Sequence, residues 1–378
     1  MPMTINTNVN SLNAQRNLSS SQSSLAMSMQ RLSSGLRVNS AKDDAAGLAI
    51  SERMNAQIKG MNVAARNAND GISLAQTAEG ALGKVGDMLQ RMRELAVQSA
   101  NATNSTADRS ALDAEVQQLK AEIGRVTSTT SFNGQKILDG SFTNRSFQVG
   151  ANSGESITVA SVANAQTNAL GVSTRASLNS VAITSLGTGA LTSVNNISIN
   201  GTAIGALGAA ATVTDRANQL VTAINTVSAT TGVTAVIDTT SNSIQLNSAA
   251  NITIVDGGVA TGYFGTLTAT AAATTGISSV DVLSAGSASQ ALATIDTALD
   301  SVNTSRGTLG ALQSRFENAI GNIQVTAENL SAARGRIVDA DFAAETANLS
   351  RAQILQQAGT AMVAQANQLP QQVLSLLR

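Results

Sequence analysis

Apolar residues recur at helical spacing toward both ends of the chain, and the first such pattern begins near the N-terminus. Leucine, isoleucine, valine and methionine repeat there every three or four residues, with one slip, from Ile5 to Leu36. A seam of this kind is typical of a helix that packs against another helix. The stretch Ser33-Ser34-Gly35 is a turn signal. We therefore expect a first helix that ends close to Gly35.

Two further helices are expected before the middle of the chain. Ser40 and Asp43 have the spacing of an N-terminal capping box, and Asp44 places negative charge at the positive end of a helix dipole. This predicts a second helix that starts near Ser40, with an apolar seam from Ile58 to Ala96. A third helix is expected at 110–126, after the polar loop NATNSTAD.

The last third of the sequence repeats the helical pattern. One apolar seam extends from Leu292 to Ile337, and the segment AARGRIVDADF interrupts it. A closing helix then carries an apolar seam at intervals of three, four and seven, formed by Leu355, Met362, Ala366, Leu369, Val373 and Leu376. No charged side chain occurs from Ala352 to Leu377. A seam of this kind needs a helical neighbour to cover it.

Between these helical ends the apolar period changes from helical spacing to two. Asn133-Gly134 and Asp139-Gly140 are hairpin-turn dipeptides, and the segments SFQVG and SITVAS alternate as half-buried strands do. Further strands are expected at NNISINGTAI, GVTAVIDTT and NSIQLNS, with a helix from Asp215 to Ser228. The pattern predicts a β-rich module inserted between two helical arms, with boundaries near Ala176 and Leu283.

The terminal seams are too apolar to be left in water. Burying one leucine or valine side chain is worth ~1.5 to 3 kcal/mol, so six or seven exposed ones forfeit a stabilisation comparable to that of a whole domain. The first helix could cover the last, but two helices bury only their shared face. Other copies of the chain are the expected cover for the remainder.

Composition supports long, closely packed helices and gives little reason to expect nucleic acid or membrane insertion. Charged residues are 12% and aromatic residues 2% of the 378 residues, and the net charge is -1. Arg16, Arg31, Arg37 and Lys42 are the only charges in the first 42 residues, whereas Asp339, Asp341 and Glu345 open the final segment. We interpret this as charge complementarity between the two ends, with a solvated, unpaired face as the alternative.

Catalytic and cofactor chemistry has little support in the sequence. Cysteine and histidine are absent, which removes disulfides, thiol nucleophiles, Cys/His zinc sites and Ser-His-Asp triads. The pairs Asp43-Asp44 and Asp339/Asp341 could bind a cation, but structural roles at helix starts are the stronger interpretation. No phosphate-binding glycine motif, Sec-type signal peptide or long apolar span is present. We expect no enzyme activity, no cofactor and no metal.

Several segments closely resemble the two ends of bacterial flagellin. They are MPMTINTNVNSLNAQRNL, RLSSGLRVNSAKDDAAGLAISERM, LQRMRELAVQSAN, FNGQKILDG and RIVDADFAAETANLSRAQILQQAGTAMVAQANQLPQQVLSLL. The resemblance covers roughly residues 1–175 and 285–378. NNISINGTAI resembles a short motif found in the variable middle of flagellins.

The resemblance implies an α+β fold in three parts and a structural role. Residues 1–42 and 338–378 would form an inner coiled-coil filament core, and residues 43–175 and 285–337 a helical second layer with a β-hairpin. Residues 176–284 would form a variable β-rich outer domain. The chain would self-assemble into the extracellular flagellar filament used for swimming. Its ends would be disordered until assembly.

Partners and residue roles also follow from the resemblance. The partners would be other copies of the chain, the flagellar cap and hook-filament junction proteins, an export chaperone and the flagellar type III export apparatus. Filament core packing falls on Ile5, Val9, Leu12, Leu25, Met29, Leu32, Leu355, Met362, Leu369, Val373 and Leu376. The connection between parts falls on Gly35, Arg37, Asp43, Asp44, Asp339 and Asp341.

Recognition of the monomer by the vertebrate Toll-like receptor for flagellin is a further implication. The matching positions are Arg91, Leu95 and Gln98, with Glu115 on the neighbouring helix. Spacings of four and three place the first three residues on one stripe of a helix, and we expect that stripe to be exposed. The same stripe could instead pack against the next subunit.

Two other functions share part of the pattern. A hook-filament junction protein has similar helical ends, but its closing segment does not resemble QANQLPQQVLSLLR. A secreted adhesin or glycan-binding module could use such helices only as a stalk. Electron microscopy of purified protein warmed with seed fragments separates the two classes, because flagellin would grow long uniform filaments and an adhesin would stay monomeric and bind glycans.

Overall fold

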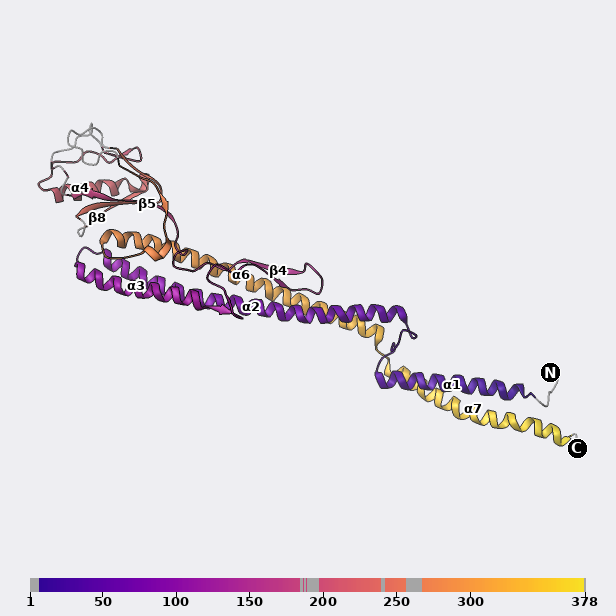
Figure 1. Ribbon diagram of the computed structural model, residues 1–378. Coiled ribbons are helices and arrows are strands. Elements are labelled where there is room, and N and C mark those ends of the chain that lie inside the picture. The colour runs from indigo at the N-terminus through magenta and orange to yellow at the C-terminus, as the bar shows by residue number, and fades with distance from the viewer. Residues whose placement is uncertain are drawn as a thin grey trace. The chain divides into compact units, whose positions relative to one another are not determined.

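The computed structural model describes residues 7–183, 186, 188, 197–238, 242–255 and 267–376, without the side chains of residues 179–181 and 369–376 (Figure 1). Its α-helices are α1 Val9–Ser34, α2 Ala45–Ala100, α3 Thr106–Thr129, α4 Val213–Thr226, α5 Ser228–Thr231, α6 Ala285–Val338 and α7 Phe342–Leu376. Long helices combined with small separate sheets confirm the predicted α+β class.

The chain forms two compact units. The first comprises the described residues of Met1–Ala68, Gln148–Ser156 and Asn318–Arg378, and the second those of Asn69–Phe147 and Ile157–Glu317. The first unit therefore contains α1, α7, the start of α2 and the end of α6. The second contains α3, most of α2 and α6, and the sheets.

In the first unit, α1 and α7 lie side by side and run antiparallel (Figure 1). The Asn8 side chain caps the start of α1 by accepting a hydrogen bond from the Ser11 amide at 3.1 Å. Gly35 ends the helix with a φ of 71°, a left-handed conformation that glycine adopts at little cost. The predicted end of the first helix is confirmed.

The predicted start of the second helix is wrong by several residues. Ser40 and Asp43 do contact each other, with 3.0 Å between the Ser40 hydroxyl and the Asp43 carboxylate, but they close a turn before the helix. The N-cap of α2 is Asp44, whose Oδ1 accepts a hydrogen bond from the Gly47 amide at 2.8 Å. Two acceptors so close in sequence compete for the cap, and only Asp44 is followed directly by helical backbone.

The helical core of the second unit forms where α2, α3 and α6 bury their predicted seams. Its side chains are almost completely inaccessible: Leu82, Val85, Leu89, Met92, Val116, Ile123, Ile295, Val302 and Phe316. Side-chain bonds link α2 to both neighbours, from Arg91 to Glu115 of α3 and from Arg93 to Asp296 of α6. A helix covered by two others buries a wider face than a single stripe.

Two small antiparallel hairpins accompany these helices. In the first, β1 Ser131–Phe132 pairs with β2 Gln135–Lys136 across Asn133-Gly134, which have φ values of 48° and 76°. This is the predicted two-residue turn. In the second, β3 Thr143–Gln148 pairs with β4 Ser156–Ser161. The ring of Phe147 in β3 meets that of Phe316 in α6 edge to face, with centroids 5.5 Å apart.

The β-rich module contains two four-stranded sheets with strand orders β11-β10-β6-β7 and β12-β5-β9-β8. The strands are β5 Thr174–Ala182, β6 Ser198–Ile199, β7 Thr202–Ala203, β8 Val233–Asp238, β9 Ser243–Ser248, β10 Ile252–Val255, β11 Leu267–Ala269 and β12 Ala272–Ala273. β12 pairs with β5 through Ala272↔Arg175 and Ala273↔Thr174. The first and last strands of the module are therefore hydrogen-bonded neighbours.

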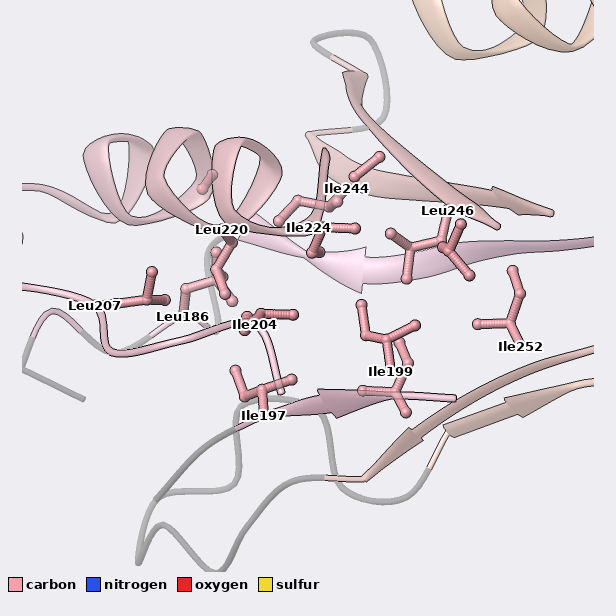
Figure 2. Packing of buried hydrophobic residues seen from close by; sticks show 14 of the residues in the cluster. Leu186, Ile197, Ile199, Ile204, Leu207, Leu220, Ile224, Ile244, Leu246 and Ile252 are labelled. Carbon is pink, nitrogen blue, oxygen red and sulfur yellow. The ribbon is translucent and has the colours of Figure 1, made fainter. Parts of the chain in front are cut away.

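Aliphatic side chains from α4 and both sheets form the core of this module. Figure 2 shows Leu220 and Ile224 of α4 turned toward the interior that also holds Ile199, Ile204 and Leu246. A capping box between Thr212 and Asp215 starts α4. The predicted helix at Asp215–Ser228 is confirmed, with both ends about two residues nearer the N-terminus.

A buried arginine, Arg109, links α3 to the end of α2. The sequence alone did not predict this link. Arg109 is 3% exposed, and its guanidinium donates hydrogen bonds to the carbonyls of Ser99 at 3.0 Å and Asn101 at 3.1 Å. These carbonyls lie at the C-terminus of α2, where the helix leaves acceptors unpaired. Arg109 thus supplies a donor to the carbonyl of Ser99, a fully buried residue, whereas the exposed Asn101 also accepts from the Asn104 amide at 3.3 Å.

We expect Arg109→Ala to destabilise the helical core of the second unit by about 2–4 kcal/mol, because two charge-assisted hydrogen bonds are lost and the carbonyl of the buried Ser99 is left unpaired. Urea unfolding followed by helical circular dichroism measures this loss. Arg125→Ala is the matched control, since Arg125 lies on the same helix with an exposed partner, Glu122. Equal stability of the two variants would contradict the capping role of Arg109.

Candidate functional site

The terminal helices contact each other through a seam of mostly small and polar residues. In α1 the less exposed positions recur at intervals of three and four: Ser11, Ala14, Leu18, Ser21, Leu25, Ser28 and Leu32. In α7 they follow the same spacing: Glu345, Leu349, Ala352, Gln356, Gly359, Val363 and Ala366. This is the heptad geometry of a coiled coil. It buries little apolar surface per turn because few of its side chains are large.

Most of the large apolar residues on these helices lie outside that seam. Val9 is 60%, Leu12 48%, Met29 56%, Leu355 50% and Met362 63% exposed. Val9, Leu12 and Met29 belong to the same predicted seam as Leu25 and Leu32. The structure separates the two groups, since Leu25 and Leu32 face α7. The apolar surface left open on α1 and α7 also includes Met27, Phe342 and Ile354.

Four predicted core positions fall where the structure gives no side-chain description. Ile5 lies outside the described residues. Leu369, Val373 and Leu376 belong to the described backbone of α7, but their side chains lie outside the description. Their assignment to the filament core therefore stays a prediction.

An open groove runs between the exposed parts of α1 and α7. Its volume is about 500 Å³. Its walls combine asparagine and glutamine side chains with Leu18, Leu355, Met362 and small residues. Because exposed Leu355 and Met362 line the groove together with seam residues such as Leu18 and Gly359, it is continuous with the uncovered apolar side chains.

The segments that join the helices of the first unit are held by backbone pairing. Leu36 and Asp339 form an isolated antiparallel bridge, and the Ala340 amide donates to the Gly35 carbonyl at 2.9 Å. Arg37 donates from its own amide to the Val338 carbonyl and from its guanidinium to the Ile337 carbonyl, each at 2.6 Å. A guanidinium at this place pairs the last carbonyls of α6.

The four predicted connection carboxylates occupy local structural positions. Asp44 caps α2, and Asp341 caps α7 by accepting hydrogen bonds from the amides of Ala343 at 2.9 Å and Ala344 at 3.2 Å. Asp43 closes the turn with Ser40, and Asp339 takes part in the bridge to Leu36. Among the described residues, no group of three His, Cys, Asp or Glu could hold a metal ion.

Charge complementarity between the two ends reduces to one pair in the described part of the chain. Arg31 of α1 and Glu345 of α7 approach to 3.9 Å. Arg37 is bound to helix carbonyls instead of carboxylates. The Arg31 charge also contributes, as the smallest of several causes, to the lowered pKa of Asp43.

The predicted receptor stripe on α2 is only partly exposed. Arg91 forms ion pairs with Glu115 at 2.8 Å and with Glu94 at 3.0 Å, and these bonds, with that to Glu115 foremost, raise the pKa of its guanidinium. Gln98 is exposed. Leu95 is only 1% exposed, so its place on an exposed stripe is wrong. The buried face of α2 extends to Leu95 because two helices cover it.

Known protein families match both helical ends of the chain and part of the β-rich module between them. The family described as the bacterial flagellin N-terminal helical region matches residues 5–143, and the corresponding C-terminal helical region matches residues 292–377. The flagellin hook IN motif matches residues 196–250, which include the segment expected to carry such a motif.

Full-length relatives and one solved structure complete the comparison. Flagellin D of Vibrio anguillarum is 42% identical over 381 residues, and B-type flagellin of Pseudomonas aeruginosa is 40% identical over 491 residues; both alignments cover 100% of each chain. The structure of FliC from Burkholderia pseudomallei is 24% identical, with 65% of this chain and 99% of that chain covered and a TM-score of 0.41.

The family matches place this fold, with helical ends and a β-rich module between them, in a class of structural proteins that are not enzymes. The chain belongs to the bacterial flagellin family. It is a structural subunit of the flagellar filament and lies outside the cell. No helix in the described ranges has the length and apolarity to cross a membrane.

The stability of the turn before α2 is expected to depend on pH. Hydrogen bonds from the Ser40 amide and hydroxyl hold the pKa of Asp43 below its ordinary 3.8. A lowered pKa in the folded chain means that the turn is stabilised above the ordinary pKa and loses that stabilisation as pH falls through the folded value.

We expect Ser40→Ala to raise the pKa of Asp43, measured by carbon-13 NMR titration of the aspartate carboxyl groups. Asp108, whose pKa is lowered by Ser105 in the capping box of α3, serves as the internal control and should titrate as before. An unchanged Asp43 titration would contradict the contribution of the Ser40 hydroxyl, since the backbone amides of residues 39 and 40 still donate to Asp43 in this variant.

Proposed function

We propose that the apolar residues left open on α1 and α7 are the surface through which flagellin subunits pack in the core of the filament. The observation that carries this proposal is the separation of the small, polar seam inside the chain from the large side chains outside it. Val9, Leu12, Met29, Leu355 and Met362 retain about half or more of their exposure. Covering five such side chains stabilises a subunit by several kcal/mol, since full burial of each is worth ~1.5 to 3 kcal/mol.

The weak internal seam also fits a chain that is exported unfolded and ordered at its ends by assembly. Most of the stability of a helix in a protein comes from packing of its apolar face, and the contact between α1 and α7 offers few large side chains for this. Neighbouring subunits would supply the missing burial. Comparison of amide hydrogen exchange in monomer and filament tests this, and equal protection of α1 and α7 in both states would contradict it.

Membership of the flagellin family supports further partners during export and assembly. We propose an export chaperone and the flagellar type III export apparatus as partners before assembly, and the cap and hook-filament junction proteins as partners at the ends of the filament. Each would meet the chain at its terminal helices, since these carry most of the large exposed apolar side chains in the described structure.

Receptor recognition of the monomer is a second proposal, carried by the exposed ion-paired group on α2 and α3. Arg91, Gln98 and Glu115 present charged and amide groups to solvent. Leu95 would act beneath them, by holding the helix face in place. Arginine is among the residues that dominate binding energies at protein interfaces.

Assembly is tested by a truncation that removes residues 355–378. The helical core of the second unit should stay folded, because its buried residues all lie outside the deleted range, whereas filament growth on seeds should be abolished. Circular dichroism and electron microscopy measure the two results. Normal filaments from the truncated chain would contradict the proposal.

A full-length variant sharpens this test. Leu355→Ser with Met362→Ser should raise the critical concentration for assembly by about tenfold or more, because about half of two large apolar side chains is removed from the interface. Gln353→Ser with Gln357→Ser, at exposed polar positions of the same helix, is the matched control and should assemble as the unsubstituted chain does.

The receptor proposal predicts that Arg91→Ala lowers the response of cells carrying the Toll-like receptor for flagellin by about tenfold or more, as expected for an interface anchor. Arg93→Ala is the matched control, since Arg93 is a similarly exposed arginine of α2 that pairs with Asp296. Leu95→Ala is a poor test because it opens the core. An undiminished response to folded Arg91→Ala protein would refute the role of Arg91.

A further inference from the structure

The heptad seam between α1 and α7 does not by itself specify how far one helix is displaced along the other. Small residues fill most of it, so a slip of one heptad replaces one small side chain by another. Leu18 faces Gly359, and a slip of seven residues would bring it opposite Ala352 or Ala366, which are also small. Packing therefore distinguishes these registers weakly.

Register nevertheless matters for the surface that the pair presents. A slip of one heptad displaces α7 along α1 by about 10 Å, since each residue of a helix rises about 1.5 Å. Val9 and Leu12 would then meet a different part of α7, and Leu355 and Met362 would lie elsewhere relative to them. Subunits in mixed registers would not offer each other a uniform surface.

Charge distinguishes the registers where packing does not. Glu345 is the only acidic residue in either helix, and the basic ones are Arg16, Arg31 and Arg351. The Glu345 carboxylate is 3.9 Å from Nη1 of Arg31, and Glu345 is only 8% exposed. The slip that brings Ala352 opposite Leu18 would place this carboxylate beside Leu25, in the seam and without its cation, which is costly. The opposite slip would carry the carboxylate past Ser34, where α1 ends, and away from Arg31.

We propose that Arg31 and Glu345 set the register of the α1–α7 pair. A single polar or charged contact in a helical seam is well suited to this role, because it penalises the alternatives more than it stabilises the chosen state. At the other end of the pair, the Asn8 side chain donates to the Ala366 carbonyl at 2.7 Å and the Ser11 hydroxyl to Asn367 Oδ1 at 2.8 Å. These contacts hold the same register, and so does the backbone bridge between Leu36 and Asp339 beside the joined ends of the two helices. The ion pair acts together with them, as the contact that penalises a slipped seam.

The neighbouring charges do not duplicate this pair. Arg16 and Arg351 are exposed and form no ion pair in the described structure. The charge of Arg31 is the smallest of the causes that lower the pKa of Asp43, after the hydrogen bonds from Ser40 and Asn39. Asp43 is exposed and belongs to the turn before α2. The buried Nε of Arg31 has no hydrogen-bond partner among the described residues, so no wider network fixes its guanidinium.

The proposal rests on the proposed function only in taking α1 and α7 to form the filament core, and its test needs no filament. The chain has no cysteine, so introduced pairs report register without background. Leu18→Cys with Gly359→Cys reports the observed register, since a Cβ built at Gly359 lies 3.6 Å from that of Leu18, within disulfide range. Leu18→Cys with Ala352→Cys, or with Ala366→Cys, reports a slip of one heptad.

Oxidation is carried out on the full-length, unassembled chain in trimethylamine N-oxide, which strengthens burial. With Arg31 and Glu345 intact, the Leu18/Gly359 pair should form nearly all of the intramolecular disulfide. Glu345→Gln should raise the slipped disulfides about fivefold or more relative to the observed one. Glu345→Asp, which retains the charge, should restore the original ratio.

Arg16→Gln is the matched control and should leave the ratio unchanged. Helical circular dichroism of each variant separates a change of register from a loss of helix. A constant ratio in Glu345→Gln protein that retains its helices, or no Leu18/Gly359 disulfide in the parent chain, would overturn the proposal. Filament growth by the same proteins is scored separately, so that failure to assemble bears on the proposed function alone.

Discussion

The large apolar side chains of the terminal helices have no sufficient partner inside their own chain, and the rest of the structure depends on this constraint. The seam between α1 and α7 is built from serine, alanine, glycine and a few leucines, so the two helices approach closely without covering their larger residues. A monomer that buried those residues internally would be more stable alone and would have less to gain from its neighbours. In the proposed packing, the unfavourable exposure of these side chains in one subunit would supply the driving force for the polymer.

The second unit follows the opposite rule. Its helices bury complete seams, its module has an aliphatic core of its own, and the end of α2 is closed by Arg109. Such a unit covers most of its large apolar side chains itself, although Val97, Val172, Val255 and Leu283 stay exposed. One chain thus combines a part with an extensive core of its own and a part that, in the proposed packing, is completed by other copies.

Periodicity in the sequence was enough to find the long helices, the Asn133-Gly134 hairpin and the helix of the β-rich module. It was not enough to choose between two stripes on one helix. Leu12 and Leu25 look equivalent in the sequence, yet only Leu25 faces α7, because contact is decided by the partner's side chains as well as by spacing. Leu95 was misplaced for a related reason, since nothing in its spacing shows that two helices cover α2.

Polar residues were the least predictable part of the candidate site. Asp43 and Asp44 stand side by side, and the choice of helix cap depends on which of them precedes the first helical turn in three dimensions. Arg109 reads as an ordinary surface arginine of α3, and its burial follows from the fold of the loop that precedes it. The ion pair of Arg31 and Glu345 joins residues more than three hundred positions apart, and only the general complementarity of the two ends was visible beforehand.

The pairing of β5 with β12 has a consequence for how this protein can change over evolution. The chain leaves the helical scaffold and returns to it through two strands that are hydrogen-bonded to each other, so the separation of the two connecting points is fixed by one small patch of sheet. Sequence can then be added, lost or exchanged beyond that patch without altering the spacing of the helices that build the filament. The β-rich module is thereby free to diversify, while the helices outside it keep their spacing.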